Sequence, residues 1–251
     1  MLPPDAPLPP QAYRSVVEAF VDGLRVVLGD DLVGVYLYGA VTFPRPEDWG
    51  LLDVDFHTLL ARPPTSGQRD GLRDVHARLG EASDGYHLLL ADAGGSSPPA
   101  SVAGAFPSTA GAVVAGPVDE AWALHRAHVH AGRVAVLHGR DPRTVLVPPT
   151  WPELLDGLSE ELRYVVDHPE HAAFGVLNAC RVAWSMAHRD VVVSKHEAAR
   201  WGSADRPAWS PALAAGVRAY TGRPEPGDDQ LLEAGRALIL PAAVEALASA
   251  G

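Results

Sequence analysis

The stretch Leu32–Leu60, LVGVYLYGAVTFPRPEDWGLLDVDFHTLL, decides the fold of this 251-residue chain. Its first part, Leu32–Tyr38, is an apolar run of strand length, and Gly39 ends it. The segment 41–50 is punctuated by proline and glycine, which is typical of a connection. A second hydrophobic strand then opens at Asp53. The stretch therefore predicts two strands of one small sheet, joined by a loop.

Two carboxylates stand at the start of the second strand. Residues i and i+2 of a strand lie on one face, so Asp53 and Asp55 are expected to point the same way, with Val54 and Phe56 on the other side. Two unpaired carboxylates on one face repel each other and resist burial. A hard divalent cation removes both costs, because Mg²⁺ takes carboxylate oxygens together with substrate phosphate oxygens. The pair therefore favours a metal-dependent phosphoryl or nucleotidyl transfer site, against the alternative of a solvated acidic strand end.

The rest of the N-terminal part alternates between helical and strand periodicities. This order favours a small α/β (α+β) domain with a mixed sheet. The expected helices are 11–28, 68–79 and 119–131, and the expected strands are 32–38, 53–60, 86–91 and 134–137, with a short strand at 112–115.

From Trp151 onward the pattern is helical throughout. Thr150 is expected to cap the first helix, with proline in its first turn and Glu153 at the capping-box position. We expect two domains, one spanning residues 1–146 and an all-α one spanning 147–251. The expected helices of the second domain are 152–167, 170–188, 195–202, 208–221 and 229–249.

Composition narrows the class of protein. The formal net charge is −11, which opposes binding to a nucleic-acid backbone and favours a cationic partner. A single cysteine, Cys180, allows no intramolecular disulfide. The N-terminus lacks the basic and apolar regions of a secretory signal, and no run approaches the length of a membrane span. We expect a cytoplasmic monomer that binds neither nucleic acid nor membrane.

Two segments carry a family resemblance. LYGA followed by DVDFHTLL resembles the Gly-Ser and Asp-x-Asp signature of the polymerase-β-like nucleotidyltransferases. VLNACRVAWSMAHRDVVVSKHEAARW (Val176–Trp201) is similar to the helical C-terminal domain of the aminoglycoside adenylyltransferases of the streptomycin/spectinomycin type. The resemblance implies an enzyme that uses Mg²⁺ and moves AMP from ATP to a hydroxyl of an aminoglycoside-like cationic small molecule. It also implies a nucleotidyltransferase domain followed by a helical substrate-binding domain.

The resemblance assigns roles to particular positions. Asp53 and Asp55 would hold the metal and the triphosphate, and Gly39 and Ala40 would lie against a nucleotide phosphate. The family usually has serine where Ala40 stands, and the missing hydroxyl removes one hydrogen bond, worth on the order of 1 kcal/mol. Lys195, which follows Ser194 at a helix start, would contact the ATP phosphates.

The general base is the open position. The family usually places an acidic residue on the strand after the Asp-x-Asp strand, and the expected strand 86–91, YHLLLA, contains none. Asp84 can fill the role through a register shift. His87 can fill it as a base with an unperturbed pKa near 6.5. The third alternative is that the base is missing and catalysis is weak or absent.

The resemblance implies that the acceptor meets acidic and aromatic residues just before the Val176 helix. Asp167 and Glu170 could receive its ammonium groups. His168 and His171 stand where the family has tryptophan. Together with Ala40 and the open base position, this departure leaves a second hypothesis, namely a relative that binds a nucleotide or small molecule without transferring anything.

Overall fold

The structure, a computed structural model, describes residues 11–44, 53–95, 101–105, 109, 112–114 and 121–250. The described residues divide into two compact units, one ending at Pro149 and one beginning at Thr150. Within these ranges, no helix combines the length and apolar composition that a membrane span needs.

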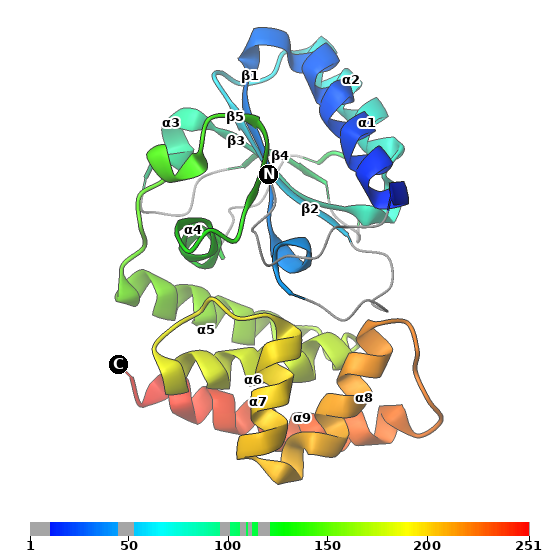
Figure 1. The fold of residues 1–251 in the computed structure, drawn as a ribbon, viewed down its shortest axis with the longest axis vertical. Coiled ribbons are helices and arrows are strands. Elements are labelled where there is room, and N and C mark those ends of the chain that lie inside the picture. The colour runs from blue at the N-terminus through cyan, green and yellow to red at the C-terminus, as the bar shows by residue number, and fades with distance from the viewer. Residues whose placement is uncertain are drawn as a thin grey trace. The chain divides into compact units, whose positions relative to one another are not determined.

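The N-terminal unit contains a five-stranded sheet in the order β4-β3-β2-β1-β5 (Figure 1). β2 and β3 are parallel, whereas every other neighbouring pair is antiparallel, so the sheet is mixed, as predicted. The strands are β1 Leu32–Leu37, β2 Val54–Leu60, β3 Ser83–Leu89, β4 Ser101–Ala105 and β5 Ala135–Gly139. The α-helices of this unit are α1 Gln11–Leu28, α2 Ser66–Ala77, α3 Leu90–Ala93 and α4 Trp122–His130.

Each face of the sheet is covered by a different set of elements. α1 and α2 lie side by side on one face, where Phe20 and Leu24 of α1 pack against Phe56 of β2 (Figure 1). On the other face Trp122 and Val129 of α4 belong to a second apolar cluster. β2 is buried from both sides because its side chains alternate between these two clusters.

The edge of the sheet beyond β2 differs from expectation. β3 begins at Ser83, three residues earlier than predicted, and the chain enters α3 at Leu90. The first residues of β3 are polar, but they still form a strand because they pair with β2, beginning with Ser83 opposite Val54. The short Gly/Ala-rich strand β4 was missed. Only Val114 of the expected strand 112–115 makes a bridge, to Gly104, and Ala115 lies outside the described residues.

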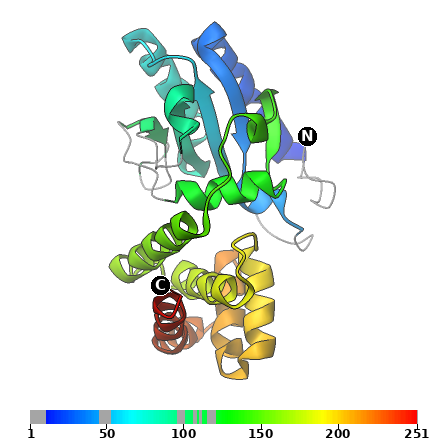
Figure 2. The same cartoon turned by 90° about the vertical axis from the view of Figure 1, so that its left-hand side faces the viewer.

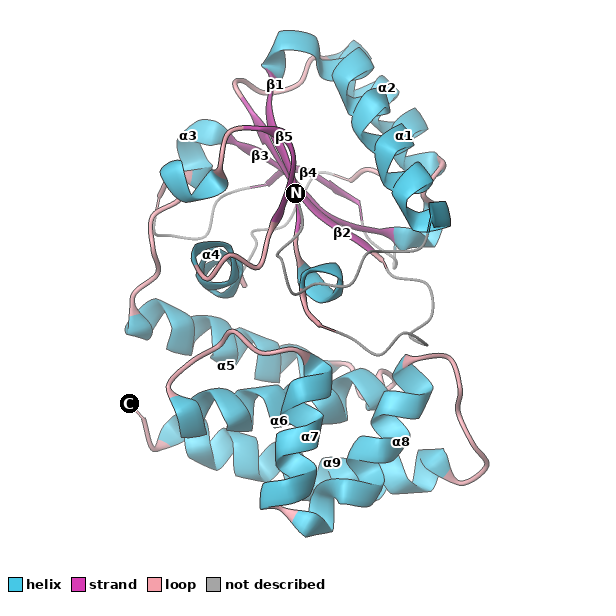
Figure 3. Cartoon of the chain, in the orientation of Figure 1, coloured by secondary structure: helices cyan, strands magenta, loops and turns pink. Residues whose placement is uncertain are grey.

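The C-terminal unit is helical in its described part (Figure 3). The helices are α5 Trp151–Asp167, α6 Ala172–His188, α7 Lys195–Asp205, α8 Ser210–Tyr220 and α9 Asp228–Ala248. α6 lies at the centre, in contact with α5, α7, α8 and α9 (Figure 2). The expected cap at α5 is present, because the Glu153 carboxylate accepts hydrogen bonds from the Thr150 backbone N–H at 2.9 Å and from its hydroxyl at 2.7 Å. The fold class predicted from sequence is therefore confirmed.

Candidate active site

The backbone around Asp53 and Asp55 is held by neighbouring elements. Asp53 immediately precedes β2 and is exposed, and its carbonyl accepts a hydrogen bond of 3.2 Å from the Tyr13 hydroxyl of α1. Asp55 is partly buried, and its carbonyl accepts one of 3.1 Å from the backbone N–H of Tyr38. The two aspartates are two residues apart, which is the spacing at which strand side chains share a face.

Asp84 lies beside Asp55 in the sheet. The two residues are register partners on the parallel strands β2 and β3. Partners in a parallel pair point to the same face, and Asp84 is partly buried, like Asp55. The earlier start of β3 thus puts a carboxylate on the strand next to the Asp-x-Asp pair, where the expected strand 86–91 had none.

His87 points away from these carboxylates. It is three residues beyond Asp84, so strand alternation directs it to the opposite face of the sheet. There it is fully buried, with the Thr58 hydroxyl 2.5 Å from its Nδ1 and Nε2 of His76 2.8 Å from its Nε2. Burial holds the pKa of His87 well below its usual range. The alternative that made His87 the base does not fit this position.

His87 is part of a buried chain of four polar side chains. His76 of α2 lies between His87 and Ser83, with its Nδ1 2.7 Å from the Ser83 hydroxyl. Burial lowers the pKa of His76 to about 4, so both imidazoles are neutral at pH 7. The chain ties α2 to β2 through Thr58 and to β3 through Ser83.

Gly39 touches the Asp55 carboxylate. Its φ is +68°, in the region that side chains disfavour. A Cβ added there would lie 1.9 Å from Asp55 Oδ2 and 2.7 Å from Asp55 Cγ. Glycine is therefore required at position 39 for two reasons. The backbone has a positive φ, and only a residue without a side chain leaves room for the Asp55 carboxylate.

Ala40 follows in a short 3₁₀ turn, Gly39–Thr42. Its carbonyl accepts a 3.3 Å hydrogen bond from the Phe43 N–H. The nearby Thr42 hydroxyl is fully buried and donates to the Gly39 carbonyl at 2.8 Å. That hydroxyl is engaged in the turn, so it does not replace the serine hydroxyl that Ala40 lacks.

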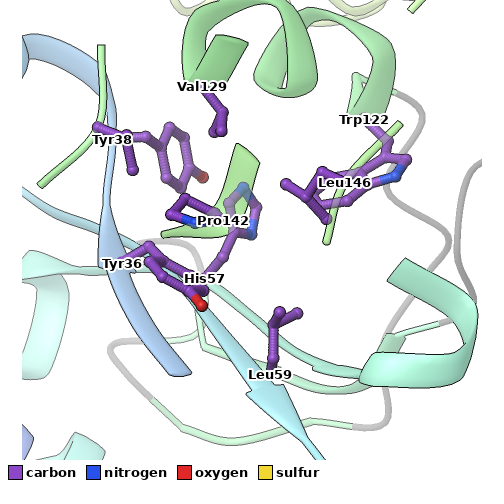
Figure 4. A pocket seen from close by; sticks show the side chains of 9 residues that line it. Tyr36, Tyr38, His57, Leu59, Trp122, Val129, Pro142 and Leu146 are labelled. Carbon is purple, nitrogen blue, oxygen red and sulfur yellow. The ribbon is translucent and has the colours of Figure 1, made fainter. Parts of the chain in front are cut away.

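A layer of aromatic and imidazole rings adjoins the aspartates on the same sheet face, and sequence reasoning missed it. His57 is two residues from Asp55 and stacks on Tyr38, with ring centroids 4.3 Å apart and planes 8° apart. Its Nε2 is 3.0 Å from Nδ1 of His125 on α4. Figure 4 shows His57 among the side chains that line a small cavity, together with Tyr38, Tyr36 and Trp122. The volume of this cavity is about 10 Å³. That volume holds about one water, so the layer is packing behind the aspartates rather than a ligand pocket.

The donor set fits the divalent cation that the resemblance implies. Asp53, Asp55 and Asp84 offer carboxylate oxygens, which are the ligands of a hard cation such as Mg²⁺. Mg²⁺ usually keeps waters and binds through one or two protein carboxylates plus substrate phosphates. Asp53 and Asp55 are therefore the residues that would hold it, since both offer hard oxygen ligands.

In the C-terminal unit, two aromatic rings enclose Lys195. This residue is the first of α7, where the Ser194 hydroxyl caps the helix by accepting a 3.0 Å hydrogen bond from the Glu197 N–H. The ammonium lies 4.7 Å from the Phe174 ring centroid and 4.5 Å from that of Tyr220, and it donates to the Tyr220 hydroxyl at 3.0 Å. The ring faces offset the unfavourable position of a cation at a helix N-terminus.

A sequence signal for Lys195 was available. It is the sole lysine of the chain, and every other member of its 20 basic residues is arginine. Phe174 and Tyr220 are distant in sequence and show no such signal, so their proximity to Lys195 required the structure. An ammonium is a compact charge with three donors, which arginine does not reproduce.

Asp167 and Glu170 lie at the turn between α5 and α6. Asp167 is the last residue of α5, and both side chains are exposed. A hydrogen bond from its own backbone, followed by one of 3.0 Å from His168 Nδ1, holds the pKa of Glu170 below its usual value. The Tyr164 ring lies against the His168 ring, with centroids 4.2 Å apart and planes tilted by 34°, and it meets the Phe174 ring edge-on at 5.5 Å. Tyr164 thus supplies an aromatic surface here that sequence reasoning missed.

Comparison with known proteins bears on both units. Residues 149–239 match the family model of the aminoglycoside adenylyltransferase C-terminal domain. None of the curated protein sequences matches the chain. Among solved structures, the chain is similar to the spectinomycin adenyltransferase AAD(9) from Enterococcus faecialis, crystallised with ATP and spectinomycin. The TM-score is 0.75 at 13% sequence identity, over 92% of this chain and 99% of that one. Residues 149–239 are therefore similar to the C-terminal domain of the aminoglycoside adenylyltransferases, and the chain shares the fold of the adenyltransferase AAD(9).

Proposed function

We propose that the protein transfers AMP from ATP to a hydroxyl of a cationic, aminoglycoside-like small molecule. The observation that carries this proposal is the placement of Asp84 beside Asp55 on parallel strands, with Gly39 against the Asp55 carboxylate. The C-terminal family match and the likeness to a structure containing ATP and spectinomycin support the same reaction.

In the proposed reaction the acceptor hydroxyl oxygen attacks the α-phosphorus of ATP. A new P–O bond forms, the bond from the α-phosphorus to the bridging oxygen breaks, and pyrophosphate leaves with that oxygen. Asp84 takes the hydroxyl proton, because its carboxylate lies on the strand next to Asp55 and shares its register position. This assignment replaces the earlier alternative of His87.

Asp53 and Asp55 would hold Mg²⁺ and, through it, the triphosphate. When bound, Mg²⁺ neutralises phosphate charge and stabilises charge that develops on the transferring group. Gly39 and Ala40 would bring the backbone close to a phosphate, which the absence of a Gly39 side chain allows. Lys195 would contact phosphate oxygens, with Phe174 and Tyr220 fixing its ammonium.

The acceptor would place its ammonium groups on Asp167 and Glu170. Both carboxylates are exposed, and the lowered pKa of Glu170 keeps it ionised at neutral pH. A hydrogen-bonded pair of a carboxylate and an ammonium is stronger than a neutral hydrogen bond. The net charge of −11 also attracts a cationic acceptor.

The test is pyrophosphate release from ATP and Mg²⁺ in the presence of streptomycin or spectinomycin. We expect release that depends on acceptor and metal, and its loss in Asp53→Asn with the circular dichroism spectrum and melting temperature unchanged. Asp53 is exposed, so this substitution should not disturb folding. Retained activity in Asp53→Asn would contradict the proposed metal site.

A specific observation favours a second candidate function. Ala40 lacks the hydroxyl usual at its position, and the Thr42 hydroxyl is engaged elsewhere. A protein weakened in phosphate contacts could bind nucleotide or acceptor without transferring AMP. Thermal stabilisation by ATP and Mg²⁺ without any pyrophosphate release would select this candidate over transfer.

A further inference from the structure

We infer that the turn between α5 and α6 binds a borderline transition-metal ion such as Zn²⁺ through His168, Glu170 and His171. Each of these residues offers one ligand atom, and the three atoms lie within 4.8 Å of one another. In the part of the chain that the structure describes, this is the one group of three His, Cys, Asp or Glu side chains whose ligand atoms approach so closely. These three residues belong to the C-terminal unit, whereas Asp53 and Asp55 of the proposed Mg²⁺ position belong to the N-terminal unit.

The backbone of the turn fixes the spacing of the ligands. His168 follows the last residue of α5, and His171 immediately precedes α6. The His171 backbone N–H donates a 3.1 Å hydrogen bond to the His168 carbonyl, and Pro169 restricts the chain between them. The two imidazole rings are near parallel, with planes 16° apart and centroids 5.7 Å apart. The histidines are thus presented on one side of a closed turn.

The ligand distances are close to those of a metal site. His168 Nδ1 lies 3.0 Å from Glu170 Oε1. Two ligand atoms bound to Zn²⁺ in tetrahedral geometry lie about 3.4 Å apart, given typical Zn–N and Zn–O bond lengths. The His168–Glu170 distance is slightly shorter than this value, and all three ligand atoms lie within 4.8 Å of one another, so small side-chain adjustments would bring them to bonding distance. Exposure of Glu170 and His171 leaves room for water as the fourth ligand.

A neighbouring hydroxyl can orient one of the imidazoles. The Tyr164 hydroxyl lies 3.1 Å from His171 Nδ1, so Nε2 is the atom of this ring that would face a metal. Metal-bound histidines commonly donate their other N–H to an oxygen in this way.

The chemistry of the donor set selects the ion. Two imidazoles and one carboxylate suit Zn²⁺, Cu²⁺ or Ni²⁺, whereas Mg²⁺ prefers oxygen ligands alone. The carboxylate offsets part of the charge of the cation. The nearby N-terminus of α6 disfavours a cation. This assignment does not rest on the proposed transfer reaction, although Glu170 is common to both.

The experiment is a calorimetric titration of Zn²⁺ into the tag-free full-length chain, with Mg²⁺ titrated separately. We expect one saturable Zn²⁺ site per chain at this turn and no Mg²⁺ binding there. His168→Asn and His171→Asn should each lower the Zn²⁺ affinity at least tenfold. Asparagine is a suitable replacement because it is a favoured residue at the start of a helix, where His171 stands.

The matched control is His188→Asn. His188 is also exposed, but it stacks on Trp184 at the C-terminal end of α6 and should leave Zn²⁺ affinity unchanged. Substituting Co²⁺ adds a spectroscopic readout, since a tetrahedral site with imidazole ligands gives visible absorption that the two variants should lose. An unchanged Zn²⁺ isotherm in the folded double variant His168→Asn/His171→Asn would overturn the assignment.

Discussion

Asp55 and Asp84 occupy the same register position on two adjacent parallel strands, so their carboxylates point to one face of the sheet. The proposed reaction assigns metal binding to Asp55 and proton abstraction to Asp84. These roles make different predictions for kinetics, because a general base titrates in the rate profile whereas a metal ligand mainly supports binding of the nucleotide.

Replacement of the proposed base should reduce turnover. Asp84→Asn keeps the size of the side chain and removes its ability to accept the proton, so kcat should fall about 10²- to 10⁴-fold. The KM for ATP should change little, and the acidic limb of the kcat profile against pH should disappear. His87→Gln is the matched comparison on the same strand. It should lower the melting temperature but leave that acidic limb in place, and the reverse pattern would contradict the assignment.

Gly39→Ala should inactivate the protein by displacing a carboxylate. The new methyl group would have to occupy space 1.9 Å from Asp55 Oδ2, in addition to adopting a φ of +68°. Gly29→Ala separates the two effects, because Gly29 has a φ of +53° and no atom within 4 Å of an added Cβ. Both variants should lose about 1 kcal/mol or more from backbone strain, measured by chemical denaturation. Only Gly39→Ala should abolish pyrophosphate release.

Lys195 offers a direct test of phosphate contact. Because it is the sole lysine, amine acylation followed by mass spectrometry reports one side chain alone, apart from the N-terminal amine. ATP with Mg²⁺ should slow acylation of Lys195 severalfold and leave the N-terminal amine unaffected. Equal labelling with and without nucleotide would argue against the proposed role.

The rings around Lys195 should control its position. Tyr220→Leu removes a ring 4.5 Å from the ammonium and should raise the KM for ATP about two- to fivefold, the size expected of one exposed cation–π contact. Tyr220→Phe keeps the ring face and loses only the 3.0 Å hydrogen bond, so its effect should be smaller. Equal effects of the two variants would show that the hydroxyl, rather than the ring, holds the ammonium.

The buried histidines should make folding sensitive to acid. The pKa of His76 falls from 6.5 to about 4 on folding, and that of His87 also falls. The unfolded chain therefore binds more protons as pH drops below 6.5, and stability is lost in the direction of acid. His76 alone should lower the free energy of unfolding by about 2 kcal/mol between pH 7 and pH 5. Urea denaturation at both pH values measures this, and the double variant His76→Phe/His87→Leu should show a smaller difference.

Sequence reasoning reached the parts of the fold that depend on local periodicity. The helix 11–28 and the α5 cap at Thr150 were predicted correctly because their signals lie within one turn or one amphipathic stripe. The start of β3 was wrong because Ser83, Asp84 and Gly85 have low strand propensity. Pairing with β2 overrides that propensity, and pairing is a tertiary property.

In the candidate site, too, local motifs could be found from the sequence, whereas tertiary contacts could not. Asp53, Asp55 and Gly39 were found because a short motif carries them, and their functional roles stay predictions. The contacts of His57 with His125 and of Lys195 with Tyr220 join residues far apart in the chain. No pattern in one sequence encodes which distant rings will meet, so these partners came from the structure.

Because β3 pairs in parallel with β2, the register between the two strands determines which residue of β3 faces Asp55. Asp84 and His87 are separated by an odd number of positions, so a regular strand can never present both to Asp55 at once. A slip of one residue would exchange them, turning Asp84 toward α2 and His87 toward the aspartates. Three hydrogen bonds oppose that slip. Those of His87 to Thr58 and to His76 need His87 on the face toward α2, and that of His76 to Ser83 needs Ser83 on the same face. Thr58, His76 and Ser83 do not contact the substrate in the proposed reaction, yet they would determine that Asp84 rather than His87 faces Asp55.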